Sequence, residues 1–284
     1  MLYSLKELGS KGRGLVSTKF INHGEKVFQE TSAAAILNSA KLDRYCHHCF
    51  RLSKTSSCCE TCNTNSQQSH QALLNKCDLT VLNSENRRFP QLIAQLVAKS
   101  ITSKVGFQMF WGDVLKLAAP QNFDGGNDTE QDYKNLQTCF QPVMNKEAIN
   151  AIFGSLDLNW YNRMHGILHV NSIGMNPLPS IEETKINPNP TTFPVVNDVG
   201  VGLFTTASML NHSCEPSLAM YRDPYTFDPS VIFFATRDIN VSEELTISYL
   251  PNSLTMNVHA RQEELLYKYG FECDCSLCSL QIKQ

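Results

Sequence analysis

The spacing of the cysteines constrains this chain more than any other feature of its sequence. Eleven cysteines occur in 284 residues, and most of them fall into two groups. In the first group, Cys46 and Cys49 are separated by two residues, and so are Cys59 and Cys62. This spacing lets both thiolates of a pair reach one metal ion at about 2.3 Å, and two pairs complete a tetrahedron. We therefore predict a zinc site of Cys46, Cys49, Cys59 and Cys62, with Cys58, His70 or Cys77 as alternative ligands.

The second group lies near the end of the sequence and consists of Cys273, Cys275 and Cys278. Three thiolates leave one position free on a tetrahedral zinc ion, which either a distant residue or water must fill. Cys139 stands apart from both groups, and we predict that it is a small buried apolar side chain.

The composition predicts a globular chain with a sizeable core, because 42% of the residues are hydrophobic and 18% are charged. The formal net charge of −3 argues against a dedicated nucleic-acid-binding protein. The sequence contains no run of about 18 uncharged apolar residues, so we expect no membrane span. The first residues also lack the apolar run of a signal peptide. We expect an intracellular protein whose thiols stay reduced.

The apolar pattern changes character along the chain. Residues 13–37 are predicted to form strands, residues 41–78 a polar, cysteine-rich insertion, and residues 85–170 helices. Within the helical part, Pro90 suits a first helical turn, and Asn145 can cap a short helix that ends before Gly154. The apolar face formed by Trp160, Met164, Ile167 and Leu168 is predicted to be core.

The last third of the chain is predicted to be mainly strands followed by a helix. Five prolines between residues 175 and 198 predict an exposed loop. Strands are expected in the apolar runs Val199–Thr206, Val231–Thr236 and Glu244–Tyr249, of which the second is apolar on both faces and so central. A final helix is expected from Asn257 to Tyr269, with Gly270 as its stop.

Three short motifs in this region resemble those of a known family. They are Asn211-His212-Ser213-Cys214-Glu215-Pro216, Glu244-Leu245-Thr246-Ile247-Ser248-Tyr249, and Tyr269-Gly270-Phe271-Glu272-Cys273-Asp274-Cys275 with Cys278. Together they resemble the SET domain of protein lysine methyltransferases, and more narrowly the SET-and-MYND subfamily, in which a cysteine-rich finger divides the SET domain. The resemblance extends to Gly12-Arg13-Gly14-Leu15, Val170-Asn171-Ser172 and Val199-Gly200-Val201-Gly202-Leu203-Phe204.

The resemblance implies an α+β fold of short curved β-sheets with a zinc-finger insertion, a helical insertion and a C-terminal post-SET zinc site. The implied divisions are an N-terminal SET part (1–40), a shortened MYND-like zinc insertion (41–78), a helical insertion (79–170), the SET core (171–256) and a post-SET helix and zinc tail (257–284). The sequence departs from the family pattern in three places. The finger lacks the third cysteine pair, so we expect one zinc ion there. Ser217 stands where family members often have Asn. The helical domain found at the C-terminus of several members is not in this sequence.

The resemblance also implies a chemistry, the transfer of a methyl group from S-adenosylmethionine to a lysine of a histone or non-histone protein. Such a lysine must react as the neutral amine although its ordinary pKa is about 10.4, and an apolar channel lowers that pKa. By resemblance, Tyr249 is the catalytic tyrosine and Tyr269 lines the channel. The implied cofactor-binding residues are Lys11, Gly12, Arg13, Asn171, Ser208, Asn211, His212, Tyr249 and Phe271.

The family also supplies a fourth ligand for the second cysteine group. Cys214 is expected to join Cys273, Cys275 and Cys278, which gives two zinc ions per chain. We expect a monomer in the nucleus or cytoplasm that binds a protein substrate and neither nucleic acid nor membrane directly. A catalytically silent scaffold that binds a partner through its finger is the alternative, and the presence of Tyr249 and Tyr269 favours the enzyme.

Overall fold

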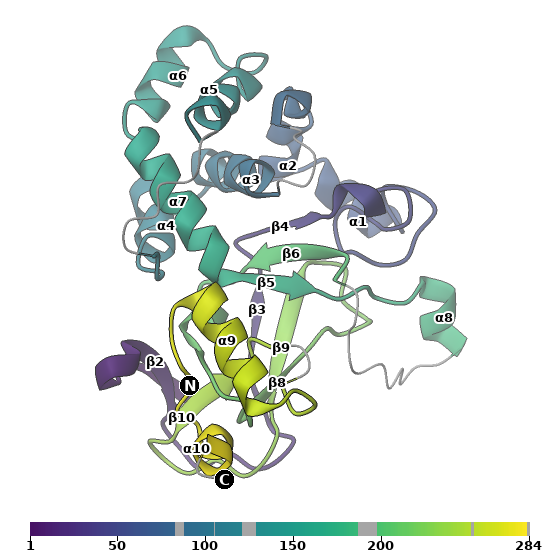
Figure 1. Ribbon diagram of the computed structural model, residues 1–284. Coiled ribbons are helices and arrows are strands. Elements are labelled where there is room, and N and C mark those ends of the chain that lie inside the picture. Colours follow the sequence, from purple (N-terminus) through teal and green to yellow (C-terminus); the bar gives the residue numbers. More distant parts are fainter. Residues whose placement is uncertain (83–87, 105, 121–128, 187–197, 251–252, 283–284) are drawn as a thin grey trace.

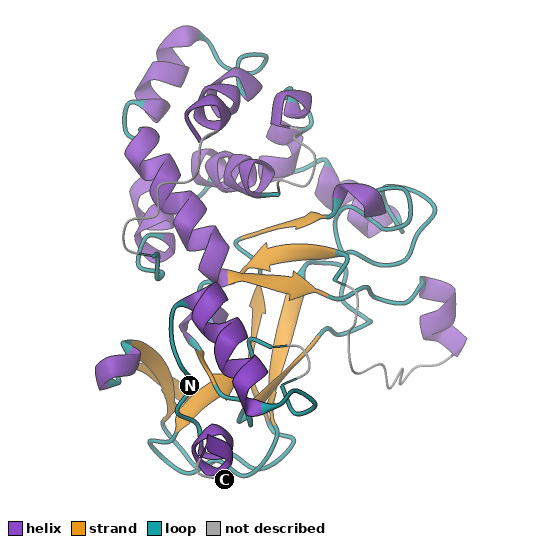
Figure 2. Ribbon diagram, viewed as in Figure 1, coloured by secondary structure: helices purple, strands orange, loops and turns teal. Residues whose placement is uncertain are grey.

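The structure is a computed structural model that describes residues 1–82, 88–104, 106–120, 129–186, 198–250 and 253–282. Its strands form small sheets, and a block of helices lies beyond one side of them (Figure 1). Figure 2 shows how sharply the strands and the helical block are segregated. The fold is therefore the expected mixed α+β arrangement of short sheets.

The first sheet joins segments from both ends of the sequence. Its order is β1 (Tyr3–Glu7), β2 (Arg13–Ser17), β10 (Glu244–Ile247) and β7 (Asn211–His212). β10 pairs with β2 in antiparallel fashion, and it pairs with β7 in parallel, with Ile247 opposite His212. This register brings the Asn211–His212 motif beside the strand that leads to Tyr249.

The other two sheets are three-stranded and carry much of the core. One has the order β3 (Lys26–Thr31), β9 (Ser230–Ala235), β8 (Leu218–Tyr221), and the other β4 (Ala34–Leu37), β6 (Gly200–Leu203), β5 (Ser172–Met175). β9 lies in the centre of its sheet, as its two apolar faces predicted. Phe28 of β3 stacks on Phe233 of β9, with ring centroids 4.6 Å apart.

The helical block follows the predicted periodicity. The cysteine-rich region itself contains α1 (Glu60–Ser66) and α2 (Ser69–Leu74). Between that region and β5 lie α3 (Phe89–Thr102), α4 (Phe107–Val114), α5 (Thr129–Cys139), α6 (Lys146–Phe153) and α7 (Leu158–Asn171). The Asn145 side chain caps α6 by accepting a hydrogen bond from the Ala148 backbone N–H at 2.9 Å. The predicted apolar face of α7 is buried, and Cys139 is buried in the same cluster. α7 runs directly into β5, so Asn171 lies where the helical block meets the sheets (Figure 1).

Two expectations about local structure were wrong. Strands were expected only from residue 13, but β1 precedes them and pairs with β2 from Tyr3–Ser17 to Glu7–Arg13. Residues 175–198 were expected to be a loop, but α8 (Ile181–Ile186) forms there. Ser180 and Glu183 make a reciprocal capping box at its start, with bonds of 3.1 and 2.8 Å, and this local signal outweighs the nearby prolines. Residues 187–197, with three of the five prolines, lie outside the described residues.

The C-terminal segment forms two helices joined by a sharp reversal. α9 (Val258–Tyr269) starts at Asn257, whose side chain accepts from the Ala260 N–H at 2.9 Å. Gly270 ends it with a left-handed backbone (φ +77°), and α10 (Ser276–Ile282) follows. The reversal turns Phe271 and Cys273 back toward the sheets. Among the described residues, no helix has the length and apolar character to span a membrane.

Replacing Gly270 with alanine tests whether this reversal depends on glycine. A Cβ at Gly270 would meet nothing within 4 Å, so any cost comes from the left-handed backbone alone. We expect Gly270→Ala to lower the free energy of unfolding by about 1 kcal/mol in urea titrations. Gly112→Ala is the matched control, because Gly112 lies inside α4 with open space around it and should gain up to about 1 kcal/mol. Equal effects of the two variants would contradict this explanation.

Candidate active site

The C-terminal cysteines and Cys214 meet at one point, as the family resemblance implied. The sulfur atoms of Cys214, Cys273, Cys275 and Cys278 all lie within 4.8 Å of one another. The Cys214 sulfur is 3.5 Å from that of Cys278 and 4.0 Å from that of Cys273. Three of the four residues are buried. Four converging sulfur ligands are the donor set that tetrahedral zinc prefers.

A buried arginine beside this cluster fits a bound zinc ion. Arg261 is 1% exposed, and its Nη2 lies 3.5 Å from the Cys278 sulfur. Within the described part of the chain, no carboxylate forms an ion pair with it; it donates instead to the Met256 carbonyl and the Gln281 side chain, both at 2.6 Å. A buried cation needs a negative partner. Zinc held by four thiolates carries two negative charges, which supplies that partner.

The cysteine-rich insertion contains a second group, but with one member different from the prediction. The sulfurs of Cys46, Cys49, Cys58 and Cys62 lie within 4.8 Å of one another. Cys58 takes the place predicted for Cys59, with its sulfur 3.5 Å from that of Cys49 and 3.6 Å from that of Cys62.

Cys58 and Cys59 are adjacent at the start of α1, where Cys59 is the N-cap residue, and their sulfur atoms lie 3.9 Å apart. The two-residue spacing selected Cys59, whereas the four-sulfur group contains its neighbour Cys58. The other candidates, His70 and Cys77, lie outside the group, and the Cys77 thiol donates to the Leu73 carbonyl at 3.3 Å.

Two buried arginines join this insertion to later parts of the chain. Arg222, at the end of β8, donates to the Cys49 carbonyl at 2.7 Å and to the Asn176 carbonyl at 2.5 Å. Arg51 donates to the Pro179 carbonyl at 2.7 Å and the Thr184 hydroxyl at 3.0 Å. Arg222 places positive charge near the Cys49 thiol, which again fits a zinc ion with four thiolate ligands.

Elemental analysis of single variants tests the assignment of Cys58. We expect two zinc ions per wild-type chain and one in Cys58→Ser, because three sulfur ligands bind zinc much more weakly than four. Cys59→Ser is the matched control and should keep both ions. Loss of zinc in Cys59→Ser with retention in Cys58→Ser would contradict the grouping described above.

Tyr249 lies just beyond β10, among other aromatic side chains. Its hydroxyl donates a hydrogen bond to the Leu210 carbonyl at 2.7 Å. The Tyr249 ring centroid is 4.8 Å from that of Tyr269 and 6.3 Å from that of Phe271. Burial raises the pKa of both Tyr249 and Tyr269 above the ordinary value. Both hydroxyls therefore stay protonated at neutral pH.

His212 connects Tyr249 to the C-terminal cysteine cluster. Its Nδ1 accepts a hydrogen bond from the Tyr249 backbone N–H at 2.9 Å. Burial lowers the pKa of His212 to about 4, so the ring is neutral at pH 7. With Nδ1 acting as acceptor, the ring hydrogen is on Nε2, which faces the Cys214 sulfur at 3.4 Å. One imidazole ring thus joins a predicted metal ligand to the predicted catalytic residue.

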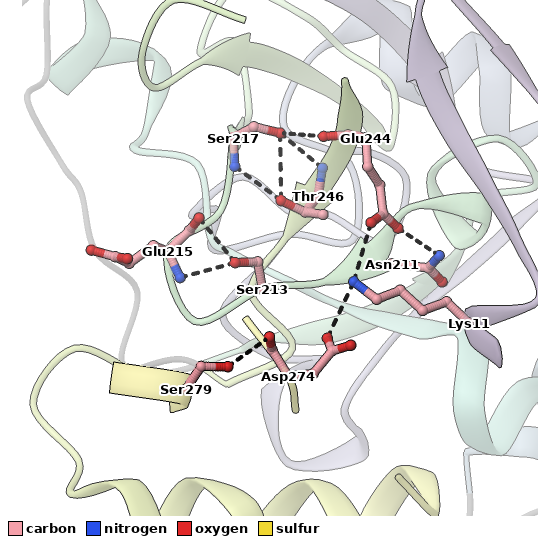
Figure 3. A network of polar contacts seen from close by, with 9 residues as sticks. All are labelled: Lys11, Asn211, Ser213, Glu215, Ser217, Glu244, Thr246, Asp274 and Ser279. Atoms are coloured by element: carbon pink, nitrogen blue, oxygen red, sulfur yellow. Dashed lines mark hydrogen bonds and ion pairs between the residues drawn. The ribbon is translucent and has the colours of Figure 1, made fainter. Parts of the chain in front are cut away.

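Lys11 and Asn211 belong to a polar network at the edge of the first sheet (Figure 3). The Lys11 ammonium lies 3.4 Å from Glu244 and 3.2 Å from Asp274, and the Asn211 amide donates to Glu244 at 2.8 Å. Partial burial alone would lower the pKa of Lys11, but the two carboxylates outweigh it and the pKa is raised. Lys11 therefore ties the N-terminal segment to the C-terminal tail. No role was predicted for Glu244 or Asp274, although both lie within the quoted motifs.

The same network explains the position of Ser217. Ser217 is buried; its N–H donates to the Thr246 hydroxyl at 3.1 Å and its hydroxyl accepts from the Thr246 N–H at 2.9 Å. Figure 3 shows this reciprocal pair beside Glu244. Ser217 thus links the segment after Cys214 to β10.

The remaining predicted cofactor residues line the junction with the helical block. Gly12 has a positive φ (+70°), and a Cβ there would meet nothing within 4 Å, so the space beside it is open. Arg13 donates to the Lys116 carbonyl. Asn171 donates to the Ala118 carbonyl at 2.8 Å, and the Ser208 hydroxyl donates to the Asn171 carbonyl at 3.4 Å. Residues 116–118, after α4, were not predicted to contribute.

The comparison with known proteins identifies the family. The family model described as "SET domain" matches residues 12–250, so the chain belongs to the SET-domain family. A SET and MYND domain-containing protein of Dictyostelium discoideum is 27% identical over 198 residues, which are 68% of this chain and 52% of that protein. The histone-lysine N-methyltransferase SMYD3 of Homo sapiens is 42% identical over 88 residues, or 31% of this chain and 19% of SMYD3.

A solved structure of the SET domain of LSMT, bound to methyllysine and AdoHcy, aligns with 96% of this chain and 53% of that chain, at 13% identity and a TM-score of 0.48. The chain spans about half, or less, of the length of these relatives. It is a SET-domain protein related to histone-lysine methyltransferases, with a cysteine group that resembles a MYND finger.

Proposed function

We propose that this chain is an S-adenosylmethionine-dependent protein lysine N-methyltransferase. The observation that carries the proposal is the setting of Tyr249. Its protonated hydroxyl is held by a buried carbonyl, its ring packs against Tyr269, and its backbone is bonded to His212 of the Asn211–Cys214 motif. Membership of the SET-domain family supports the same reaction.

The cofactor supplies a methyl group on a positively charged sulfur. Lys11, Gly12, Arg13, Asn171, Ser208, Asn211, His212 and Phe271 would hold it, and the open space beside Gly12 fits a bound ligand. Aromatic rings attract a nearby cation through their negative faces. Tyr249, Tyr269 and Phe271, whose ring centroids lie between 4.8 and 6.4 Å apart, would provide such faces.

The hydrogen bond to Leu210 defines what the Tyr249 hydroxyl can do. Because its hydrogen points to the Leu210 carbonyl, its oxygen lone pairs are free to accept. They can orient an incoming lysine amine or contact a polarised methyl C–H. The raised pKa of Tyr249 makes the phenolate rare at neutral pH, so the residue aligns the reactants instead of acting as a general base. Positioning and removal of water then account for most of the rate.

The substrate amine has to lose its proton before it attacks. Burial among the aromatic side chains disfavours the charged ammonium and lowers the pKa of the substrate lysine. Tyr269 is half-buried and also protonated, so it adds an apolar wall without adding negative charge. We propose a lysine side chain of a histone or another protein as the methyl acceptor.

Substitution of Tyr249 by phenylalanine tests the proposal directly. We expect Tyr249→Phe to lower the turnover number at least about 100-fold, or roughly 2.7 kcal/mol of transition-state stabilisation. The affinity for S-adenosylmethionine should change little, because the ring remains and only the hydroxyl is lost. Single-turnover transfer of radiolabelled methyl groups to histones and lysate proteins, with calorimetric titration of the cofactor, measures both quantities.

Tyr267→Phe is the matched control for this experiment. Tyr267 is on the same helix as Tyr269 but is 89% exposed, and loss of its hydroxyl should leave turnover unchanged. Full activity of Tyr249→Phe would show that Tyr249 contributes to packing and not to catalysis. Wild-type protein that binds the cofactor but methylates no protein would instead favour the silent scaffold.

A further inference from the structure

Glu30 lies on β3, outside every motif that pointed to the active site, yet its carboxylate is an anchor for one loop. One carboxylate oxygen accepts from the Thr206 N–H at 2.8 Å and from the Thr205 hydroxyl at 3.1 Å, and the other accepts from the Ala207 N–H at 2.9 Å. Hydrogen bonds to a charged acceptor are roughly twice as strong as neutral ones. Three of them from consecutive residues therefore fix the loop firmly to β3.

The loop begins a short 3-10 helix, η4 (Ala207–Met209). The first N–H groups of a helical turn have no partner within the turn and are usually capped by a nearby side chain. The N-cap residue Thr206 makes no such side-chain bond. Glu30, which lies on a strand 176 residues earlier in the sequence, caps the turn instead. Its negative charge also suits the positive end of the turn.

A continuous series of hydrogen bonds connects this anchor to the catalytic tyrosine. Ala207 donates its N–H to Glu30, and its carbonyl accepts from the Leu210 N–H at 3.0 Å. The Leu210 carbonyl in turn accepts from the Tyr249 hydroxyl at 2.7 Å. Leu210 is 1% exposed, so water cannot easily replace this acceptor. The direction of the Tyr249 hydroxyl therefore depends on where η4 is held.

We propose that Glu30 is a positioning residue for methyl transfer, which holds η4 so that the Leu210 carbonyl orients the Tyr249 hydroxyl. This inference rests on the proposed function. Glu30 acts through the backbone of η4 and has no direct bond to Tyr249 or to the other aromatic residues of the site. Its effect should consequently appear in turnover and should require the Tyr249 hydroxyl.

A double-mutant cycle between Glu30 and Tyr249 tests this requirement. Glu30→Gln keeps the size of the side chain but turns one acceptor into a donor that faces an N–H. We expect it to lower the turnover number about tenfold, or about 1.4 kcal/mol, while the affinity for S-adenosylmethionine changes less than about threefold. In Tyr249→Phe, which has no hydroxyl to orient, the same change should cost less than about twofold.

Two controls separate positioning from a general loss of structure. Glu25→Gln makes the same chemical change at a carboxylate that accepts from the Asn22 backbone and side chain at 3.0 and 3.1 Å in an exposed turn; its turnover should be that of the wild type. Amide hydrogen exchange should become faster in residues 205–210 of Glu30→Gln and stay unchanged in α3 and α7. If Glu30→Gln does not fold, Thr205→Val serves as the second variant, because it removes one of the three hydrogen-bond donors to Glu30. We expect it to lower the turnover number by less than Glu30→Gln would. That loss should also disappear when it is combined with Tyr249→Phe.

The outcomes distinguish this inference from the proposed function. Equal losses of turnover with and without the Tyr249 hydroxyl would show that Glu30 only stabilises the fold, and would overturn the positioning role while leaving the methyltransferase intact. Wild-type protein that transfers no methyl group would overturn both.

Discussion

The contact between Cys214 and the three C-terminal cysteines is the interaction on which the rest of the site depends. It joins segments 59 residues apart in the sequence and fastens α9 and α10 to the first sheet. The ion pair between Lys11 and Asp274 crosses the same junction, but a partly exposed pair contributes only about 0–1 kcal/mol. Binding of structural zinc contributes on the order of 10 kcal/mol. If zinc fills the cluster, the metal therefore decides whether Tyr269 and Phe271 reach Tyr249.

Tyr249 is held from two sides by different parts of the chain. On one side its backbone N–H is bonded to His212, which faces the Cys214 sulfur. On the other, its hydroxyl is bonded to Leu210 at the end of η4, which Glu30 anchors to β3. A residue whose main task is to align reactants needs such constraints, because small displacements of a reacting geometry are costly in rate.

Much of this arrangement could be predicted from the sequence, and the failures have physical reasons. The cap at Asn145 and the stop at Gly270 are local signals and were predicted correctly, and the last helix begins close to Asn257 as expected. Cys58 was expected only as an alternative ligand, because spacing alone does not say which of two adjacent thiols joins the group. Glu30 and Asp274 act through partners far away in the sequence, and no local pattern marks such bonds. β1 depends on pairing with β2, so its own sequence carries little signal.

Hydrogen exchange in a Cys275→Ser variant tests most directly whether the C-terminal cluster organises the site. The variant loses one of four sulfur ligands while the sheets keep their sequence. We predict faster amide exchange from about residue 269 to residue 282 and at the Tyr249 N–H, loss of S-adenosylmethionine binding in calorimetry, and unchanged protection in β3 and β9. A tail and a Tyr249 amide that stay as protected as in the wild type, with normal cofactor affinity, would contradict the central role given to the cluster.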